Sequence, residues 1–167
     1  MHFRLEQRFD APLEAVESAF VDPDLLAHLS GIAELGHPEL IDQAVAGDTV
    51  RQRVKYRFTG DLTPAIAAVL DRDRLTWVEE SELDRRTHCQ TFRIVPDFYG
   101  ERLRCSGTVT LGKAHGGTVR LAEADLEVRF PFVGQTVART IVAGLVENAA
   151  TQQQAVADWL STHPYPS

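Results

Sequence analysis

The stretch that decides the fold is GQTVARTIVAGLVENAATQQQAVADWL, residues 134–160, and it contains no proline. Its apolar and amide side chains recur at steps of three or four, which is the spacing of one face of an α-helix. This face consists of Val137, Ile141, Leu145, Asn148, Gln152, Val156 and Trp159. At about 1.5 Å per residue the helix would be roughly 40 Å long, so it needs a long surface to lie on. Because Asn148 and Gln152 interrupt the apolar stripe, we expect this part of the helix to face a hollow and not a packed core.

The surface under this helix is predicted to be a β-sheet, because apolar and polar residues alternate through most of the preceding sequence. The predicted strands cover residues 2–9, 39–45, 49–58, 75–83, 88–95, 103–111 and 119–130. Short helices are expected at residues 12–20, 23–30 and 65–70, each with a proline near its start. Short connections favour antiparallel hairpins. The fold class is therefore α+β: a curved seven-stranded antiparallel sheet wrapped around a long C-terminal helix, with two short helices after the first strand.

The hairpin of residues 75–95 decides which polar side chains would face the helix. A tight turn at Asp84-Arg85 would fix the register of its two strands. The side chains that this register turns inward are Leu75, Trp77, Glu79, His88, Gln90, Phe92 and Ile94. A slip of one residue would reverse the strand of residues 75–83, so the inward placement of Glu79 depends on this turn.

The remaining strands are placed by the same alternation. A two-residue turn at Gly47-Asp48 is expected, since glycine tolerates the backbone of such turns. The expected cross-strand neighbours are Val45 with Val50, Ile41 with Val54, and Phe92 with Cys105, which leaves Cys89 and Arg104 on the outer face. In the last strand Val119 and Leu121 would point inward, and so would Leu126, which needs a change of parity. We therefore expect a β-bulge near residues 122–124, which would bend the sheet.

The overall composition bounds the class of protein. A length of 167 residues with 44% hydrophobic and 25% charged residues predicts a single domain, residues 1–161, followed by a loose tail, residues 162–167. A net charge of −7 argues against a nucleic-acid partner. We expect no stable membrane insertion and no signal peptide, hence a cytoplasmic location, because no apolar run is long enough. The cysteines Cys89 and Cys105 are expected to be reduced. The oligomeric state is left open.

Four segments carry a resemblance to a known superfamily. They are YRFTGDL (residues 56–62), DRLTWVEES (residues 73–81), FRIVPD (residues 92–97) and LRCSG (residues 103–107). With the order of elements, they resemble an uncharacterised branch of the START-like (SRPBCC) helix-grip superfamily, which includes birch-pollen-allergen-like proteins and polyketide cyclases. The resemblance covers nearly the whole chain. It implies a sheet that grips the C-terminal helix, with an elongated cavity for lipids, polyketides or other apolar molecules, and it transfers no individual site residue.

The common catalytic and metal-binding motifs are missing from the sequence. There is no GxSxG, HExxH, GxxxxGK[ST] or GxGxxG segment, and the six histidines lack metal-ligand spacing. We therefore expect neither a metal nor a cofactor. The row Arg51, Arg53, Lys55 and Arg57 is expected to be a solvated face with acidic cross-strand partners, and an anion-binding patch is the alternative.

One polar constellation remains as a candidate for chemistry. Glu79, His88 and Gln90 would converge on the concave face near Asn148 and Gln152. A carboxylate beside an imidazole can act as an acid–base pair, so Glu79 and His88 are weak catalytic candidates. The same groups can instead orient the polar end of a ligand, or they are structural or exposed.

The expected cavity is lined by residues of four predicted strands and the last helix. These are Val54, Tyr56, Trp77, Glu79, Gln90, Phe92, Cys105, Val137, Ile141, Leu145 and Asn148. Non-catalytic binding of an apolar small molecule or lipid is the leading hypothesis. The alternatives are a polyketide cyclase- or aromatase-type enzyme in the same cavity, and a protein adaptor that uses the outer face of the sheet. The apolar helix at residues 65–70 is a candidate flap over one cavity mouth.

Overall fold

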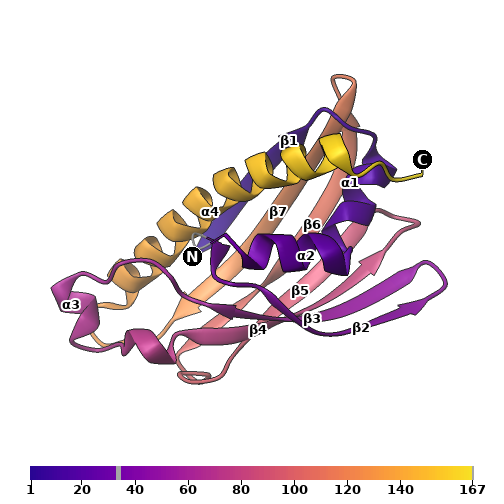
Figure 1. Cartoon of the computed structure of the whole chain (residues 1–167). Helices are drawn as coiled ribbons and strands as arrows, with labels where there is room; N and C mark the ends of the chain where they lie inside the picture. The colour runs from indigo at the N-terminus through magenta and orange to yellow at the C-terminus, as the bar shows by residue number, and fades with distance from the viewer. Residues whose placement is uncertain (33–34, 167) are drawn as a thin grey trace.

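The computed structural model describes residues 1–32 and 35–166, which form one sheet and its covering helices (Figure 1). The strands are β1 (His2–Phe9), β2 (Glu39–Ala46), β3 (Thr49–Arg57), β4 (Thr76–Asp84), β5 (Cys89–Pro96), β6 (Leu103–Ala114) and β7 (Gly117–Val128). The helices are α1 (Leu13–Phe20), α2 (Pro23–Ser30), α3 (Pro64–Ala67) and α4 (Gly134–Thr162), with a short 3-10 helix, η2, at Arg72–Arg74. All pairings are antiparallel, in the order β1-β7-β6-β5-β4-β3-β2. The predicted α+β fold class is confirmed.

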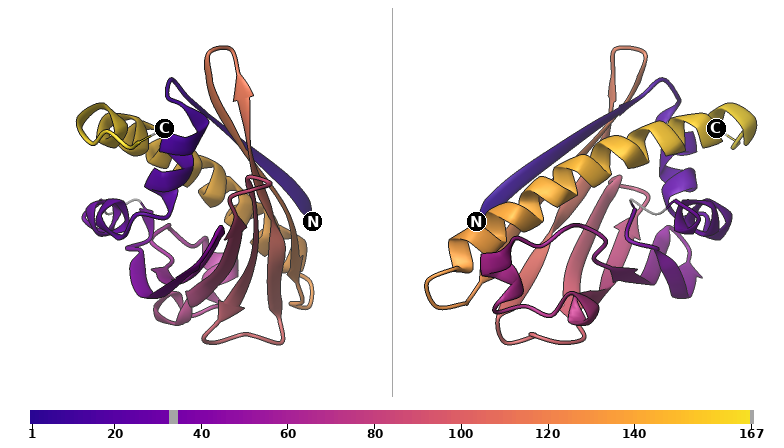
Figure 2. Two further views of the ribbon diagram at one scale, coloured as in Figure 1. Left: turned by 90° about the vertical axis from the view of Figure 1, so that its right-hand side faces the viewer. Right: turned by 60° about the vertical axis from the view of Figure 1, so that its left-hand side comes forward.

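The long helix α4 is fastened along one side of the sheet. It packs against β1 and β7 and runs beside β1 (Figure 1 and the right-hand view of Figure 2). Val137 near its start and Val156 near its end are buried, whereas Arg139 and Asp158 on the other side are exposed. The stripe predicted from the sequence therefore does face the protein.

Helices α1 and α2 support the C-terminal half of α4. Asp22 caps α2 by accepting a hydrogen bond from the backbone N–H of Asp24 at 2.8 Å, and Pro23 occupies the first helical position. Val16 of α1 and Leu25 of α2 belong to the same buried cluster as Val156 of α4. This cluster closes one end of the molecule.

The register of β4 and β5 agrees with the predicted faces. Glu79 pairs with Ile94 and Ser81 with Phe92, so Trp77, Glu79, Gln90, Phe92 and Ile94 share the concave face. The turn is longer than predicted, because Asp84 pairs with Cys89 and residues 85–88 form the loop. The prediction that His88 begins the strand is therefore wrong.

The predicted bulge in β7 is also wrong. Residues 117–128 pair with β6 without a register shift, and β1 pairs just as regularly with residues 118–125. Thr118, Arg120 and Ala122 consequently face inward, and Val119 and Leu121 face outward. The bulge was predicted because apolar residues were assumed to mark the inner face, but the inner face carries polar side chains here. These side chains are hydrogen-bonded: the Thr118 hydroxyl donates to the carbonyl of Ala11 at 2.8 Å.

A bulge occurs instead in the edge strand β2. Val45 pairs with Val50 as predicted, but the register shifts between Leu40 and Asp42, so Leu40 takes the place opposite Val54. Ile41 is extruded at this point and is 46% exposed. The predicted Ile41–Val54 pair is therefore wrong.

Phe92 lies opposite Gly107, so the predicted Phe92–Cys105 pair is wrong. The error is a register shift of two residues, which leaves both side chains on the predicted face. Ile94 is the neighbour of Cys105. A Cβ atom at Gly107 would lie 2.1 Å from the carbonyl oxygen of Glu123, so only glycine fits this position. Cys89 and Cys105 are both free and lie on opposite faces, as expected from the alternation.

Two segments outside the sheet are tied to it by buried side chains. Helix α3 begins at Pro64, one residue before the predicted range of 65–70, and ends at Ala67, three residues before the predicted end. Ile66 and Leu70 are buried against Phe130 and α4. In the segment expected to be a loose tail, the Tyr165 hydroxyl donates to Asp22 at 2.5 Å. Residues up to Tyr165 are thus held to α2, and Ser167 lies outside the described residues.

Candidate functional site

The concave face of the sheet carries an apolar surface that α4 covers only in part. Trp77, Phe92, Ile94 and Cys105 point to this face from β4, β5 and β6, and all four keep accessible surface. The helix packs along β1 and β7, at the far side of the sheet from β3 and β4. We refer to the accessible surface of these side chains, on the concave face beside α4, as the hollow.

The helix contributes the opposite wall of this hollow. Ile141 and Leu145 contact the apolar cluster around Phe3 and Leu126, and both keep accessible surface. Val137, by contrast, is fully buried near the start of α4, so it belongs to the packed core and not to the wall. The stripe of α4 is therefore sealed at its ends and accessible in its middle.

Aromatic side chains line the hollow at the β3–β4 pair. Tyr56 and Trp77 are cross-strand neighbours, with ring centroids 5.9 Å apart and planes 14° from parallel. Val54 is buried next to them, opposite Glu79. This arrangement gives an aromatic wall with a carboxyl group at its side.

Several polar side chains open into the hollow without a protein partner. Within residues 1–32 and 35–166, no hydrogen bond joins the side chains of Tyr56, Glu79, Gln90 or Asn148 to another group, and no side-chain nitrogen or oxygen is both inaccessible and unpaired. The polar atoms of these four residues must therefore touch accessible space. They are free to bind water or the polar end of a ligand.

Burial changes the acidity of two of these groups. Burial raises the pKa of Glu79, and the nearby Arg120 opposes this shift only in part. Burial, and then the Glu79 carboxylate, raises the pKa of Tyr56. Both shifts favour the neutral forms, since a low-dielectric site disfavours isolated charge.

Sequence reasoning missed Arg120, a basic residue of β7 whose side chain lies on the concave face. One of its terminal N–H groups (Nη1) donates to Oε1 of Gln7 at 2.8 Å, and its guanidinium carbon lies 4.2 Å from the centroid of the Phe20 ring. Gln7 in turn donates to the carbonyl of Ala149 at 2.8 Å and to Oε1 of Gln152 at 3.1 Å. The signal that could have found Arg120 is Gln7 itself, a polar residue on the inward face of β1.

The structure separates the proposed acid–base pair. His88 lies in the β4–β5 turn, and its Nδ1 is 2.7 Å from Oε2 of Glu17 on α1. Glu79 pairs with Ile94, and Ile94 lies six residues beyond His88 along the chain. Because an extended chain rises about 3.3 Å per residue, Glu79 and His88 are roughly 20 Å apart. The expected convergence of Glu79 and His88 is therefore wrong, because the turn is two residues longer than expected and α1 supplies the partner of His88.

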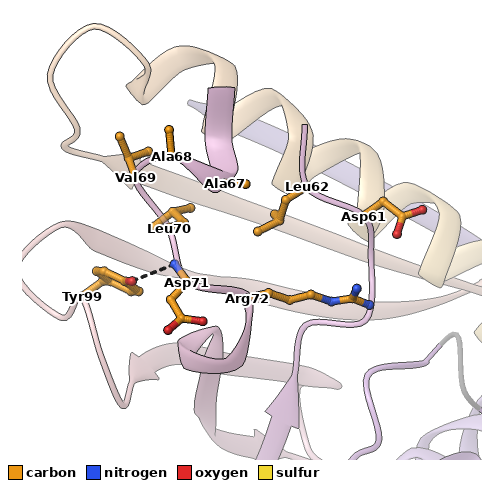
Figure 3. A pocket seen from close by; sticks show the side chains of 9 residues that line it. All are labelled: Asp61, Leu62, Ala67, Ala68, Val69, Leu70, Asp71, Arg72 and Tyr99. Atoms are coloured by element: carbon orange, nitrogen blue, oxygen red, sulfur yellow. Dashed lines mark hydrogen bonds between the residues drawn. The ribbon is translucent and has the colours of Figure 1, made fainter. Parts of the chain in front are cut away.

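An open pocket lies under helix α3, with a volume of about 660 Å³ (Figure 3). Leu62, Leu70 and Tyr99 line it together with Asp61, Arg72 and the end of α3. The Tyr99 hydroxyl accepts a hydrogen bond from the backbone N–H of Asp71 at 3.0 Å. Because Leu62, Leu70 and Tyr99 also join the cluster that contains Ile141, this pocket adjoins the α4 side of the concave face.

The basic row on the outer face is largely neutralised. Arg51 contacts Glu82 at 2.6 Å, and Arg53 and Lys55 pair with Asp42 and Asp97. The predicted acidic partners of these three residues are confirmed. A protein adaptor surface would need an unneutralised patch, so this row does not support one.

The described residues carry neither a metal cluster nor a membrane span. No three His, Cys, Asp or Glu side chains of residues 1–32 and 35–166 are placed to hold a metal ion. Within the same residues, no helix is both long and apolar enough to cross a bilayer.

The sequence matches one family model. It is described as "Protein of unknown function (DUF2505)" and covers residues 4–160. No curated protein matches the sequence.

Solved structures with this fold are numerous and distant in sequence. The protein TTHA0849 from Thermus thermophilus is 20% identical, with a TM-score of 0.65 over 98% of this chain and 100% of its own. Norcoclaurine synthase from Thalictrum flavum, in complex with dopamine and hydroxybenzaldehyde, is 15% identical (TM-score 0.67; 99% and 89% covered). The ZhuI aromatase/cyclase from Streptomyces sp. R1128 is 14% identical (TM-score 0.61; 96% and 93% covered). These similarities confirm the helix-grip fold.

Proposed function

Because this chain belongs to the DUF2505 family of proteins of unknown function and has the helix-grip fold, we propose that it binds an apolar small molecule or lipid between its sheet and α4. The observation that carries the proposal is the accessible apolar surface of Trp77, Phe92, Ile94 and Leu145 beneath the helix. Burying such surface in a ligand contributes about 25 cal/mol per Å². The partner is thus a molecule that can enter a partly covered apolar hollow.

Two further observations support binding. The norcoclaurine synthase structure holds dopamine and hydroxybenzaldehyde in the same fold, which shows that this architecture admits small aromatic molecules in that protein. In this chain, the imidazole of His88 contacts the carboxylate of Glu17, so Glu79 has no imidazole beside it. That separation favours binding without reaction.

Trp77 offers a direct readout of the hollow. The chain has two tryptophans, and Trp159 lies at the far end of α4, so Trp159→Phe leaves Trp77 as the sole tryptophan, which can be excited selectively over the tyrosines. We expect the emission of Trp77 to change when the neutral apolar dye N-phenylnaphthylamine is added. Mass spectrometry of molecules extracted from natively purified protein would then identify the bound ligand.

Cys105 and Cys89 provide a matched pair of variants. Cys105→Phe would fill the hollow, whereas Cys89→Phe makes the same change on the outer face. The dye should bind the Cys89 variant as it binds the wild type, and the Cys105 variant at least about ten times more weakly. Equal binding by both variants, or no binding to the wild type, would contradict the proposal.

A second candidate function is a cyclase- or aromatase-type enzyme in the same hollow. The specific observation is Glu79, a carboxyl group in accessible space whose pKa is raised by burial. Such a group keeps its proton at a higher pH than an ordinary glutamate does and can pass it to a substrate oxygen. Under this alternative, Glu79→Gln would abolish turnover of a polyketide substrate and leave its affinity nearly unchanged; under simple binding, no turnover is seen with either protein.

A further inference from the structure

Arg120 is a cation whose direct partners are neutral. Its guanidinium is held by the amide oxygen of Gln7 on one side and by the ring of Phe20 on the other. Within the described residues, no carboxylate lies within ion-pairing distance of it, whereas Arg51, Arg53 and Arg93 on the outer face each have one. The structure thus holds this guanidinium in place without neutralising it.

The orientation of Arg120 is fixed by Gln7. Gln7 is only 2% exposed, and its NH₂ group is used by Ala149 and Gln152 of α4, so its oxygen is left to accept from Arg120. An arginine side chain has five N–H donors, and the described residues accept from one of these. Because no inaccessible side-chain nitrogen is unpaired in the described chain, the other donor groups reach accessible space.

The charge of Arg120 is not met by an ion pair among the described residues. The acid on the concave face, Glu79, acts on Arg120 only across space: its negative charge raises the pKa of Arg120, while burial, the larger effect, lowers it. Burial also raises the pKa of Glu79, which favours its neutral form. Arginine stays protonated in proteins. A cation that is partly buried and lacks an ion pair favours an anion from outside.

We propose that Arg120 binds the carboxylate of an amphipathic acid whose apolar part lies along Trp77 and Phe92; this inference rests on the proposed function. A guanidinium presents parallel N–H groups that match a carboxylate. Lys113 at the end of β6 shares this side of the sheet, but it is exposed and lies 3.9 Å from Glu14 of α1, so Arg120 is the basic side chain of the concave face that has no ion pair among the described residues. One positive charge matches a monoanion, whereas a phosphate ester with up to two negative charges would call for a second cation.

Head-group selectivity of the wild-type protein tests the proposal without any mutation. Dodecanoate, dodecanol and dodecylammonium have the same chain and differ in the head group. In displacement of N-phenylnaphthylamine, dodecanoate should bind about ten times more tightly than dodecanol, and dodecylammonium should bind most weakly. Equal displacement by the acid and the alcohol overturns this inference but leaves apolar binding intact, whereas failure of the dye itself to bind overturns the proposed function.

Variants then assign the selectivity to one residue. Arg120→Gln should reduce the preference for dodecanoate over dodecanol to less than about three-fold. Arg120→Lys should keep part of this preference, since lysine retains the charge but lacks the parallel N–H groups of the guanidinium. Arg104→Gln, an exposed position on the outer face of β6, is the matched control and should leave the preference unchanged. If folded Arg120→Gln, checked by circular dichroism, keeps the full preference, the assignment is wrong.

Discussion

His88 Nδ1 lies 2.7 Å from Oε2 of Glu17, which ties the β4–β5 turn to a carboxylate on α1 that is only 3% exposed. Arg85 is the other basic neighbour, at 3.9 Å. His88 has a positive φ of 54°, a backbone that suits glycine, so His88→Gly removes the imidazole without straining the turn. We expect this variant to lower the free energy of unfolding by about 2 kcal/mol in urea titrations, because a buried carboxylate loses its nearest partner.

His115 supplies the control for that experiment. It also has a positive φ, of 50°, and is exposed in the β6–β7 turn. His115→Gly should change the free energy of unfolding by no more than about 0.5 kcal/mol. A similar effect of the two substitutions would mean that the contact with Glu17 contributes nothing.

Gly107 and Gly112 form a second matched pair, on the same strand. A Cβ atom at Gly107 would lie 2.1 Å from a backbone oxygen, whereas a Cβ atom at Gly112 meets no atom within 4 Å. Gly107→Ala should therefore destabilise the protein by at least about 2 kcal/mol or prevent folding, and Gly112→Ala should be neutral or slightly stabilising. Thermal unfolding of the two variants, side by side, checks the close approach of β6 and β7.

The raised pKa of Glu79 predicts a pH dependence with a definite sign. A carboxyl group with a higher pKa in the folded state than in the unfolded state binds more protons when folded, so stability falls as the pH rises above the ordinary glutamate pKa of about 4. The fall ends once the pH passes the raised pKa of the folded state. Glu79→Gln should therefore gain stability over the wild type as the pH rises from about 4 towards the raised pKa of Glu79, measured as urea midpoints.

Glu123→Gln, an exposed position on the outer face of β7, controls for the general loss of a negative charge. Parallel pH profiles for the wild type and Glu79→Gln would show that Glu79 is not held in a low-dielectric site.

The anchoring of the segment after β3 is tested by hydrogen exchange. Leu70 is 4% exposed and packs in the cluster with Ile66, whereas its neighbour Val69 is 41% exposed. Leu70→Ala should accelerate exchange of residues 64–70 more than exchange of the sheet, because the four-residue helix α3 has few hydrogen bonds of its own. Val69→Ala should leave the exchange pattern unchanged. If α3 were as protected as the sheet in the wild type, it would not act as a flap over the hollow.

The sequence predicted the long elements best because their periodicity is strong. The stripe from Val137 to Val156 and the alternation in β1 and β3 each repeat often enough to exclude other structures. The same alternation placed Tyr56, Trp77 and Glu79 on the concave face. Trp77 and Glu79 are on the correct face because the β4–β5 turn was misjudged by two residues, an even number that preserves the face.

The wrong predictions have one physical origin: contacts with residues distant in sequence override the local pattern of apolar and polar side chains. Arg120 points inward because Gln7 and Phe20 receive it, and neither residue is near it in the chain. His88 is drawn to Glu17 for the same reason. Such pairings depend on how α1 and α4 pack on the sheet, and no alternation of apolar residues contains that information.

The irregularity at Ile41 bears on how the molecule avoids self-association. Strand β2 lies at the end of the sheet, so its outer edge has no neighbouring strand among the described residues, and Val45 on it is 65% exposed. A straight apolar edge would offer a template for a strand from another copy. The extruded residue interrupts the row of backbone donors and acceptors there, so edge-to-edge polymerisation would have to begin on a bent and discontinuous ladder.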